Sequence, residues 1–113
     1  MDPNATILIH GDEWKLSDLQ AKVEEYRRRQ WRRQHWTHHD ALVHRQGGMM
    51  LPYVGQAYDQ AEFELVRGGW KRNLCEICRW ELCESDDEQH ATGYTDGLRW
   101  ICTECYDFLV RRR

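Results

Sequence analysis

Cys75-Glu76-Ile77-Cys78 and Cys102-Thr103-Glu104-Cys105 are two Cys-x-x-Cys pairs, separated by 23 residues, around which the rest of the chain is organised. Two residues between cysteines allow one short turn to direct both sulfurs at a single point about 2.3 Å from each. Two such turns complete a tetrahedral cage of four thiolates, the usual closed geometry of structural zinc. The sequence therefore predicts one structural Zn²⁺ held by Cys75, Cys78, Cys102 and Cys105.

Other roles of paired cysteines fit this sequence less well. A disulfide framework requires an oxidising compartment. The first residues, Met1-Asp2-Pro3-Asn4, lack the basic segment of a secretion signal, and the apolar run Ile7-Leu8-Ile9 is too short to cross a membrane. A thioredoxin-like redox pair would accompany a βαβ pattern, which we do not find. We therefore expect a cytoplasmic protein that does not act at a membrane.

The fifth cysteine, Cys83, lies five residues after Cys78 and outside the spacing of either pair. A free cysteine is most often a small buried apolar residue, which is the role that we favour here. The alternative is a substitute metal ligand or a redox-sensitive thiol, which needs an exposed and electropositive setting.

The length of 113 residues predicts a single domain, 1–113, with one modest core and a metal site. The net charge of −3 is unevenly spread. Residues 1–48 carry eight basic and seven acidic side chains (+1), whereas residues 49–113 carry eight and twelve (−4). This balance is too acidic to indicate nucleic-acid binding for the whole chain, so any such function must depend on a local basic patch.

The first half of the chain, residues 12–46, has the pattern of one long helix. Ser17 is a candidate N-cap, and no Pro or Gly occurs between Asp18 and Gly47. At about 100° per residue, one apolar face collects Leu19, Val23, Tyr26 and Ala41.

On the opposite face of that helix, four arginines cluster with one tryptophan among them: Arg28, Arg29, Arg32, Arg33 and Trp36. Such a face can bind a partner, either a protein that docks on an exposed tryptophan or a nucleic acid contacted through phosphate and stacked bases. The alternative is an ordinary solvated face, because Glu24 and Glu25 precede Arg28 and Arg29 by four residues in the favourable orientation.

The histidines of this half do not form a recognisable catalytic motif. His35 and His39 are four residues apart, but the glutamate of a metalloprotease helix is absent between them. His38-His39-Asp40 resembles part of a nuclease motif, although it precedes the first cysteine pair rather than following it. We therefore expect no catalytic residue, no small-molecule substrate and no enzymatic activity.

The second half predicts short strands around the metal, within a zinc-binding part of residues 62–113. Residues 49–54 have the pattern of an edge strand, because Pro52 cannot donate a hydrogen bond to a neighbour. Alternation predicts strands at 62–67 and 79–83, and Asp96-Gly97 predicts a hairpin turn. After the second pair, Ile101, Cys105, Phe108 and Leu109 recur at helical spacing, so we expect this face of a helix to close over the metal and the hairpin. A ligand-bearing helix in this place gives the order of a treble-clef zinc finger, with a zinc ribbon as the alternative.

A resemblance supports this interpretation. Gly69-Trp70, the first pair with Arg79-Trp80-Glu81-Leu82, Gly93-Tyr94-Thr95-Asp96-Gly97 and Trp100-Ile101 before the second pair resemble a group of small uncharacterised bacterial zinc-binding proteins. The similarity covers about residues 63–109 and implies zinc and a bacterial cytoplasmic setting, without an activity. Those proteins often have histidines before the first cysteine, where this chain has Lys71-Arg72-Asn73-Leu74.

The sequence thus predicts an α+β fold in which a long N-terminal helix packs on a small β-rich treble-clef-like zinc finger. The favoured function is a zinc-stabilised, non-enzymatic binding or regulatory module with a protein partner. The alternative is a DNA- or RNA-binding module that uses the Arg/Trp face of the helix.

Overall fold

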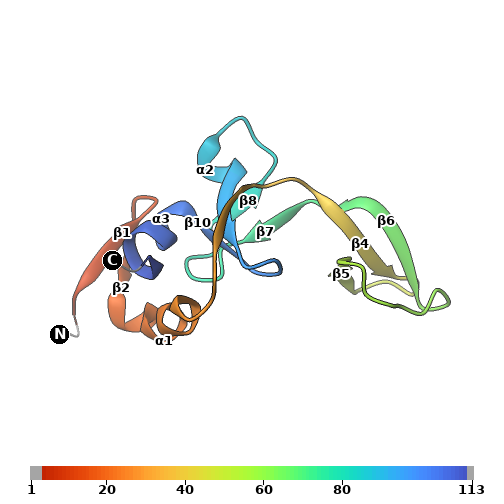
Figure 1. Ribbon diagram of the computed structural model, residues 1–113, viewed down its shortest axis with the longest axis horizontal. Coiled ribbons are helices and arrows are strands. Elements are labelled where there is room, and N and C mark those ends of the chain that lie inside the picture. Colours follow the sequence, from red (N-terminus) through yellow and green to blue (C-terminus); the bar gives the residue numbers. More distant parts are fainter. Residues whose placement is uncertain (1–3, 112–113) are drawn as a thin grey trace. The chain divides into compact units, whose positions relative to one another are not determined.

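The computed structural model describes residues 4–111, which form a mixed α/β arrangement of several small sheets and short helices (Figure 1). In chain order the elements are β1 (Thr6–Ile9), β2 (Asp12–Lys15), α1 (Leu16–Arg27), β3 (Arg32–His35), β4 (His39–His44), β5 (Met50–Pro52), β6 (Phe63–Trp70), β7 (Arg72–Leu74), β8 (Glu81–Cys83), α2 (Glu88–Ala91), β9 (Thr92–Thr95), β10 (Trp100–Cys102), α3 (Thr103–Cys105) and the π-helical turn η1 (Tyr106–Val110).

These elements divide into two compact units, where the sequence predicted one domain. The first unit combines the described residues up to Trp36 with those from Asn73 onward, and it contains both cysteine pairs. The second unit is the intervening segment Thr37–Arg72. The chain therefore leaves the first unit after β3 and returns to it in β7.

The prediction of one long helix over residues 12–46 is wrong, because α1 has only 12 residues. Its last turn is tightened by the main-chain N–H groups of Arg28 and Arg29, which donate to carbonyls three residues earlier. The indole Nε1–H of Trp31 also donates to the carbonyl of Tyr26 at 2.7 Å. The carbonyls at the end of α1 are thus used by the residues that follow it, and the helix ends without glycine or proline.

Beyond α1 the chain forms strands, because it finds sheet partners from distant parts of the sequence. β3 pairs antiparallel with β9, with Arg32 opposite Thr95 and His35 opposite Thr92, and completes the sheet β10-β9-β3. β4 pairs with both β5 and β6 in the second unit. Ala41, which the helical pattern placed beside Leu19, lies in β4 and therefore in the other unit.

Two tight hairpins shape the first unit. β1 and β2 are joined by His10 and Gly11, whose φ angles of 50° and 82° fit the type I′ turn that right-twisted strands favour. The hairpin predicted at Asp96-Gly97 is confirmed between β9 and β10. There the Asp96 carboxylate accepts N–H hydrogen bonds from Leu98 and Arg99 at 3.0 and 2.7 Å.

The core of the first unit encloses most of the cysteine site. One continuous apolar cluster contains the buried face of α1, the ends of the two hairpins and the C-terminal helical segment. Its buried members are Ile9, Leu19, Val23, Tyr26, Cys75, Ile77, Ile101, Cys102, Cys105, Leu109 and Val110. The predicted apolar stripe of Leu19, Val23 and Tyr26 is therefore confirmed, on a much shorter helix.

The second unit is a three-stranded antiparallel sheet in the order β5-β4-β6. The edge strand predicted around Pro52 is confirmed as β5. The predicted strand at 62–67 is confirmed and extends to Trp70 as β6. In the central strand β4, the adjacent residues Ala41 and Leu42 are both buried, so both faces of the sheet are covered at this point.

Candidate metal centre and binding surfaces

The two Cys-x-x-Cys pairs come together in space. One sulfur from each of Cys75, Cys78, Cys102 and Cys105 lies within 4.8 Å of all the others. The Sγ atoms of Cys78 and Cys102, one from each pair, are 3.6 Å apart. A tetrahedral site with metal–sulfur bonds of about 2.3 Å requires sulfurs about 3.8 Å apart. The four cysteines therefore form a cluster that fits one tetrahedrally coordinated metal ion.

The first pair sits in a tight turn between β7 and β8. The main-chain N–H of Cys75 donates to the carbonyl of Trp80 at 2.7 Å, and Arg79 N–H donates back to the carbonyl of Cys75 at 2.9 Å. Arg79 has a φ of 69°, an uncommon conformation for a residue other than glycine. The N–H of Ile77 points at Cys75 Sγ at 3.4 Å, as expected if this sulfur carries negative charge.

The second pair sits where β10 passes into α3. Cys102 is the N-cap of α3, and its Sγ accepts a hydrogen bond from the N–H of Cys105 at 3.3 Å. The helix predicted to follow this pair is confirmed, although it is short and continues as η1. Cys75, Cys102 and Cys105 are buried and Cys78 is half-buried.

The crowding of four thiols controls their ionisation. Burial raises the pKa of Cys75, but hydrogen bonds from the neighbouring thiols outweigh this effect and hold that pKa below its ordinary value. The neighbouring sulfurs, Cys102 first, and burial raise the pKa of Cys105 above its ordinary value. Ionisation of Cys75 is thus favoured at the expense of Cys102 and Cys105. A divalent cation would remove this competition, because all four sulfurs could then ionise.

His10 is a neighbour of this centre that the sequence analysis did not identify. Its ring stacks on Trp80 with centroids 3.6 Å apart, and its Nδ1 lies 2.8 Å from a carboxylate oxygen of Glu104. The main-chain N–H of His10 donates to the other oxygen of Glu104 at 3.0 Å. Glu104 stands between the two cysteines of the second pair, so His10 ties the β1-β2 hairpin to the ligand-bearing segment. The His-Gly dipeptide at a turn was the only indication of this role in the sequence.

The predicted basic face does not exist as one helix face. Arg28 and Arg29 follow the end of α1, whereas Arg32 and Arg33 lie in β3, where successive side chains point to opposite sides. Arg29 is also half-buried and lies 3.4 Å from Glu25 and 3.7 Å from a second carboxylate. These arginines therefore form no continuous surface with Trp36.

Trp36 is buried, and the expectation of an exposed tryptophan is wrong. Its exposed fraction is 0%, and its Nε1–H donates to the side-chain oxygen of Asn73 at 3.2 Å. Its ring also lies against Trp100, with centroids 6.5 Å apart. Trp36 follows a strand of the sheet rather than continuing a helix, and its buried ring packs beside Trp100 and Asn73 of the first unit.

The histidines of residues 35–44 are separated rather than gathered. His35 ends β3 in the first unit, whereas His39 and His44 bound β4 in the second. Among residues 4–111, the groups able to hold a metal ion include none of these three. The i,i+4 relationship of His35 and His39 is lost because the helix that would create it does not form.

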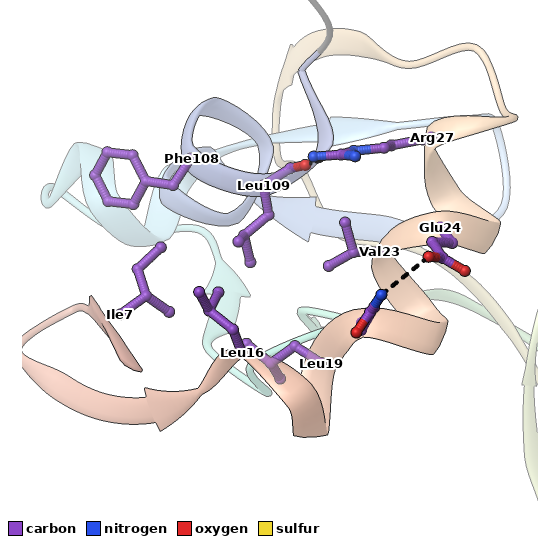
Figure 2. Close-up of a pocket in the computed structure, with 9 residues that line it drawn as sticks. Ile7, Leu16, Leu19, Val23, Glu24, Arg27, Phe108 and Leu109 are labelled. Carbon is purple, nitrogen blue, oxygen red and sulfur yellow. Dashed lines mark hydrogen bonds between the residues drawn. The ribbon is translucent and has the colours of Figure 1, made fainter. Parts of the chain in front are cut away.

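An apolar groove runs between α1 and the C-terminal helical segment of the first unit. It has a volume of about 390 Å³ and is lined by Ile7, Leu16, Leu19, Gln20, Val23, Glu24, Arg27, Phe108 and Leu109. Figure 2 shows the apolar side chains converging on one space, with Phe108 beside Ile7 and with Arg27 and Glu24 at the opposite end. Phe108 was expected to close over the metal, but its side chain is 54% exposed.

A comparison with protein-family models, curated proteins and solved structures found no significant match to this chain. The resemblance noted from the cysteine pairs and their flanking residues therefore stays a prediction. In the part of the chain that the structure describes, no helix combines the length and the apolar character needed to span a membrane.

Proposed function

We propose that this protein is a small, zinc-stabilised, non-enzymatic binding module that captures an amphipathic helix of a protein partner. The observation that carries this proposal is the apolar groove between α1 and η1, with the exposed ring of Phe108 at its edge. Apolar grooves of this kind bind the apolar face of a partner helix through side chains spaced three or four residues apart.

The metal part of the proposal is supported by the ligand set. Four sulfurs in a tetrahedral arrangement favour zinc, and they leave no coordination position for a substrate or a reactive water. The order of a cysteine turn between β7 and β8, the hairpin β9-β10 and the ligand-bearing α3 supports a treble-clef arrangement. In this proposal the metal holds the first unit together, and the groove does the binding.

The groove also indicates what kind of partner fits it. Six apolar side chains line it, whereas Gln20, Glu24 and Arg27 stand on its α1 side. Gln20 donates to Glu24 at 3.2 Å, and Arg27 Nε donates to the carbonyl of Leu109 at 2.8 Å, which joins α1 to η1. A partner helix should therefore carry a row of large apolar residues, with a basic residue placed to meet Glu24.

The nucleic-acid alternative receives less support from the contacts. Stacking on Trp36 requires an exposed ring, and this ring is fully buried. Of the arginines expected to bind phosphate, Arg28 and Arg29 follow the end of α1, and the side chains of Arg32 and Arg33 diverge in β3.

Elemental analysis with native mass spectrometry tests the metal. The purified protein should retain one zinc per chain after dialysis, and removal of that zinc with a strong chelator should unfold the first unit, because metal binding and folding are coupled. Cys105→Ser should lose the metal, whereas Cys83→Ser should keep it. Stable disulfides within the pairs in protein prepared under reducing conditions would contradict this assignment.

Replacement of Phe108 tests the groove. Phe108→Ala should weaken partner binding by about 2 kcal/mol or more, roughly 30-fold, as expected for an aromatic side chain that acts as a hot spot. Leu98→Ala is the matched control, because Leu98 is 56% exposed but lies in the β9-β10 turn, outside the groove. Affinity capture from cells with the native chain and both variants should enrich a protein that only Phe108→Ala loses.

The same preparations should be titrated with duplex and single-stranded DNA and RNA at two salt concentrations. Salt-sensitive nucleic-acid binding, together with capture that is equal for both variants, would overturn the proposed function. If Leu98→Ala also fails to capture the proteins that Phe108→Ala loses, the loss is not specific to the groove, and binding does not use it.

A further inference from the structure

A second group of metal-binding side chains lies outside the four-cysteine cluster. Glu81 and Cys83 stand at the two ends of β8, and His90 lies in α2. A carboxylate oxygen, a sulfur and a ring nitrogen from these three residues lie within 4.8 Å of one another. All three residues are half-buried, and none is shared with the first cluster. Only Cys83 stands out in the sequence, because the fold brings the other two ligands near it.

The alternation of strand β8 brings two of these ligands to the same side. Glu81 and Cys83 are two residues apart in a strand, so their side chains point to one face. Cys83 Sγ lies 3.8 Å from Glu81 Oε1. Around a tetrahedral zinc, a sulfur at about 2.3 Å and an oxygen at about 2.1 Å stand about 3.6 Å apart. The observed separation is therefore close to that of two ligands on one metal ion.

A hydrogen bond to the main chain selects one tautomer of the neutral His90 ring. Its Nδ1 lies 2.7 Å from the main-chain carbonyl of Glu81, and a carbonyl can only accept, so Nδ1 carries the proton. In the neutral ring, Nε2 then has a free lone pair. Metal-bound histidines usually donate their other ring nitrogen to a carbonyl or carboxylate in this way. The ring is also stacked on Trp80 with centroids 4.3 Å apart, which limits its rotation.

Two features position His90, and neither of them uses a ligand atom of the cluster. The hydrogen bond fixes the tautomer, and the stacking fixes the plane of the ring. Trp80 is in turn anchored, because its Nε1–H donates to the carbonyl of Gln89 at 2.8 Å. The ring of His90 therefore has a defined orientation beside β8 before any metal binds, which lowers the entropic cost of binding one.

We propose that Glu81, Cys83 and His90 bind a second Zn²⁺, one that exchanges readily and keeps a coordination position open to water. Sulfur, imidazole nitrogen and carboxylate oxygen are all ligands that zinc accepts, and three protein ligands leave the fourth position for a small molecule. On binding, Cys83 releases its thiol proton to the solvent and coordinates as the thiolate. This site goes beyond the proposed function, because it does not depend on the groove or on any partner.

Metal titration of the native protein tests this proposal. Protein dialysed to one zinc per chain should take up a second equivalent of Zn²⁺ in isothermal titration, and a weak chelator should remove that second equivalent first. With ¹¹³Cd²⁺ as the probe, two resonances should appear, one for the four-sulfur site and one for a mixed-ligand site. The mixed-ligand resonance should be missing in Cys83→Ser.

Three variants identify the ligands, and a fourth is the control. Cys83→Ser, His90→Gln and Glu81→Gln should each weaken the second site by more than the 10- to 100-fold typical of changes around a metal ligand. Asp86→Asn removes an exposed carboxylate of the adjacent loop without removing a ligand, and it should leave the affinity nearly unchanged. Retention of the first zinc in each variant shows that the first unit is folded.

Two results would overturn the proposal. One is a native protein that binds no second equivalent of Zn²⁺ or Cd²⁺. The other is a second equivalent that survives Cys83→Ser or is lost equally in Asp86→Asn, which would show attraction of the cation to the acidic loop rather than coordination.

Discussion

Replacing Trp36 with alanine separates a role in the core from a role in binding. The side chain is 0% exposed, and burying a tryptophan removes about 150–250 Å² from water. At about 25 cal/mol per Å², this area corresponds to about 4–6 kcal/mol of folding free energy. Measured truncations of buried aromatic residues give about 3–5 kcal/mol. Because small proteins are stable by only about 5–15 kcal/mol, Trp36→Ala should lose a large share of the folding free energy.

Urea unfolding at a fixed free zinc concentration measures this loss. With a slope of about 1–3 kcal/mol per molar urea, a loss of 3–5 kcal/mol lowers the unfolding midpoint by at least about 1 M. Trp36→Phe keeps most of the apolar contact but loses the hydrogen bond to Asn73, so it should cost less. Leu98→Ala, a change at an exposed position, should stay within about 0.5 kcal/mol of the native protein.

If Trp36→Ala unfolds at the same urea concentration as the native chain, burial of this side chain does not stabilise the fold. If this variant keeps its stability and also loses a partner, Trp36 belongs to a binding surface after all.

Three further predictions follow from other contacts. Gly93→Ala should destabilise the first unit by about 1–3 kcal/mol, measured by urea unfolding, because its new Cβ would meet the carbonyl oxygen of Ile101 at 2.9 Å. Burial, reinforced by a neighbouring histidine and opposed by a neighbouring carboxylate, lowers the pKa of His39 below its ordinary 6.5. The second unit should therefore lose stability as the pH falls below 6.5, where the unfolded chain takes up a proton that the folded chain does not. NMR titration should give a pKa below 6.5, and His39→Gln should flatten the pH dependence. Arg32→Ala combined with Arg33→Ala should not change the salt dependence of any DNA binding. A plot of log K for DNA binding against log salt concentration with a slope of about −2 to −4, flattened in the double variant, would instead establish a phosphate-binding surface.

Local patterns predicted the part of the fold that local contacts determine. The two cysteine pairs, the Asp96-Gly97 hairpin and the edge strand at Pro52 each depend on a few neighbouring residues, and the structure contains all three. The apolar stripe of α1 was also visible, because a short stretch of helical periodicity reports which side is buried.

The long helix failed because its end is determined by distant residues. Nothing in residues 28–46 forbids a helix, but β9 offers a sheet edge to residues 32–35, and β6 offers one to residues 39–44. Pairing with these strands outweighs a weak intrinsic preference, since tryptophan, histidine and threonine are only moderate helix formers. The faces drawn on a helical wheel beyond Arg27 were lost with the helix.

The sequence likewise predicted some features of the candidate sites and missed others. The spacing of the four cysteines in the sequence is enough to predict their cluster. The groove forms only where β1, α1 and η1 meet in the fold. Phe108 shows the difficulty, because its position in a helical stripe indicated burial and the fold leaves it exposed. Glu81 and His90 are unremarkable in the sequence, and only the return of α2 beside β8 brings them to Cys83.

The point where the chain leaves and re-enters the first unit has a consequence for how this architecture can vary. The Nε1–H of Trp36 donates a hydrogen bond to Oδ1 of Asn73 at 3.2 Å. The segment Thr37–Arg72 therefore leaves the first unit and returns to it at adjacent positions. A segment attached in this way behaves as a cassette, because doubling its length adds only about 0.6 kcal/mol to the cost of closing the loop. The four-cysteine scaffold should therefore accept a shortened, enlarged or wholly foreign insert between these two residues, and chimeric chains built there would vary the inserted unit without altering the metal site.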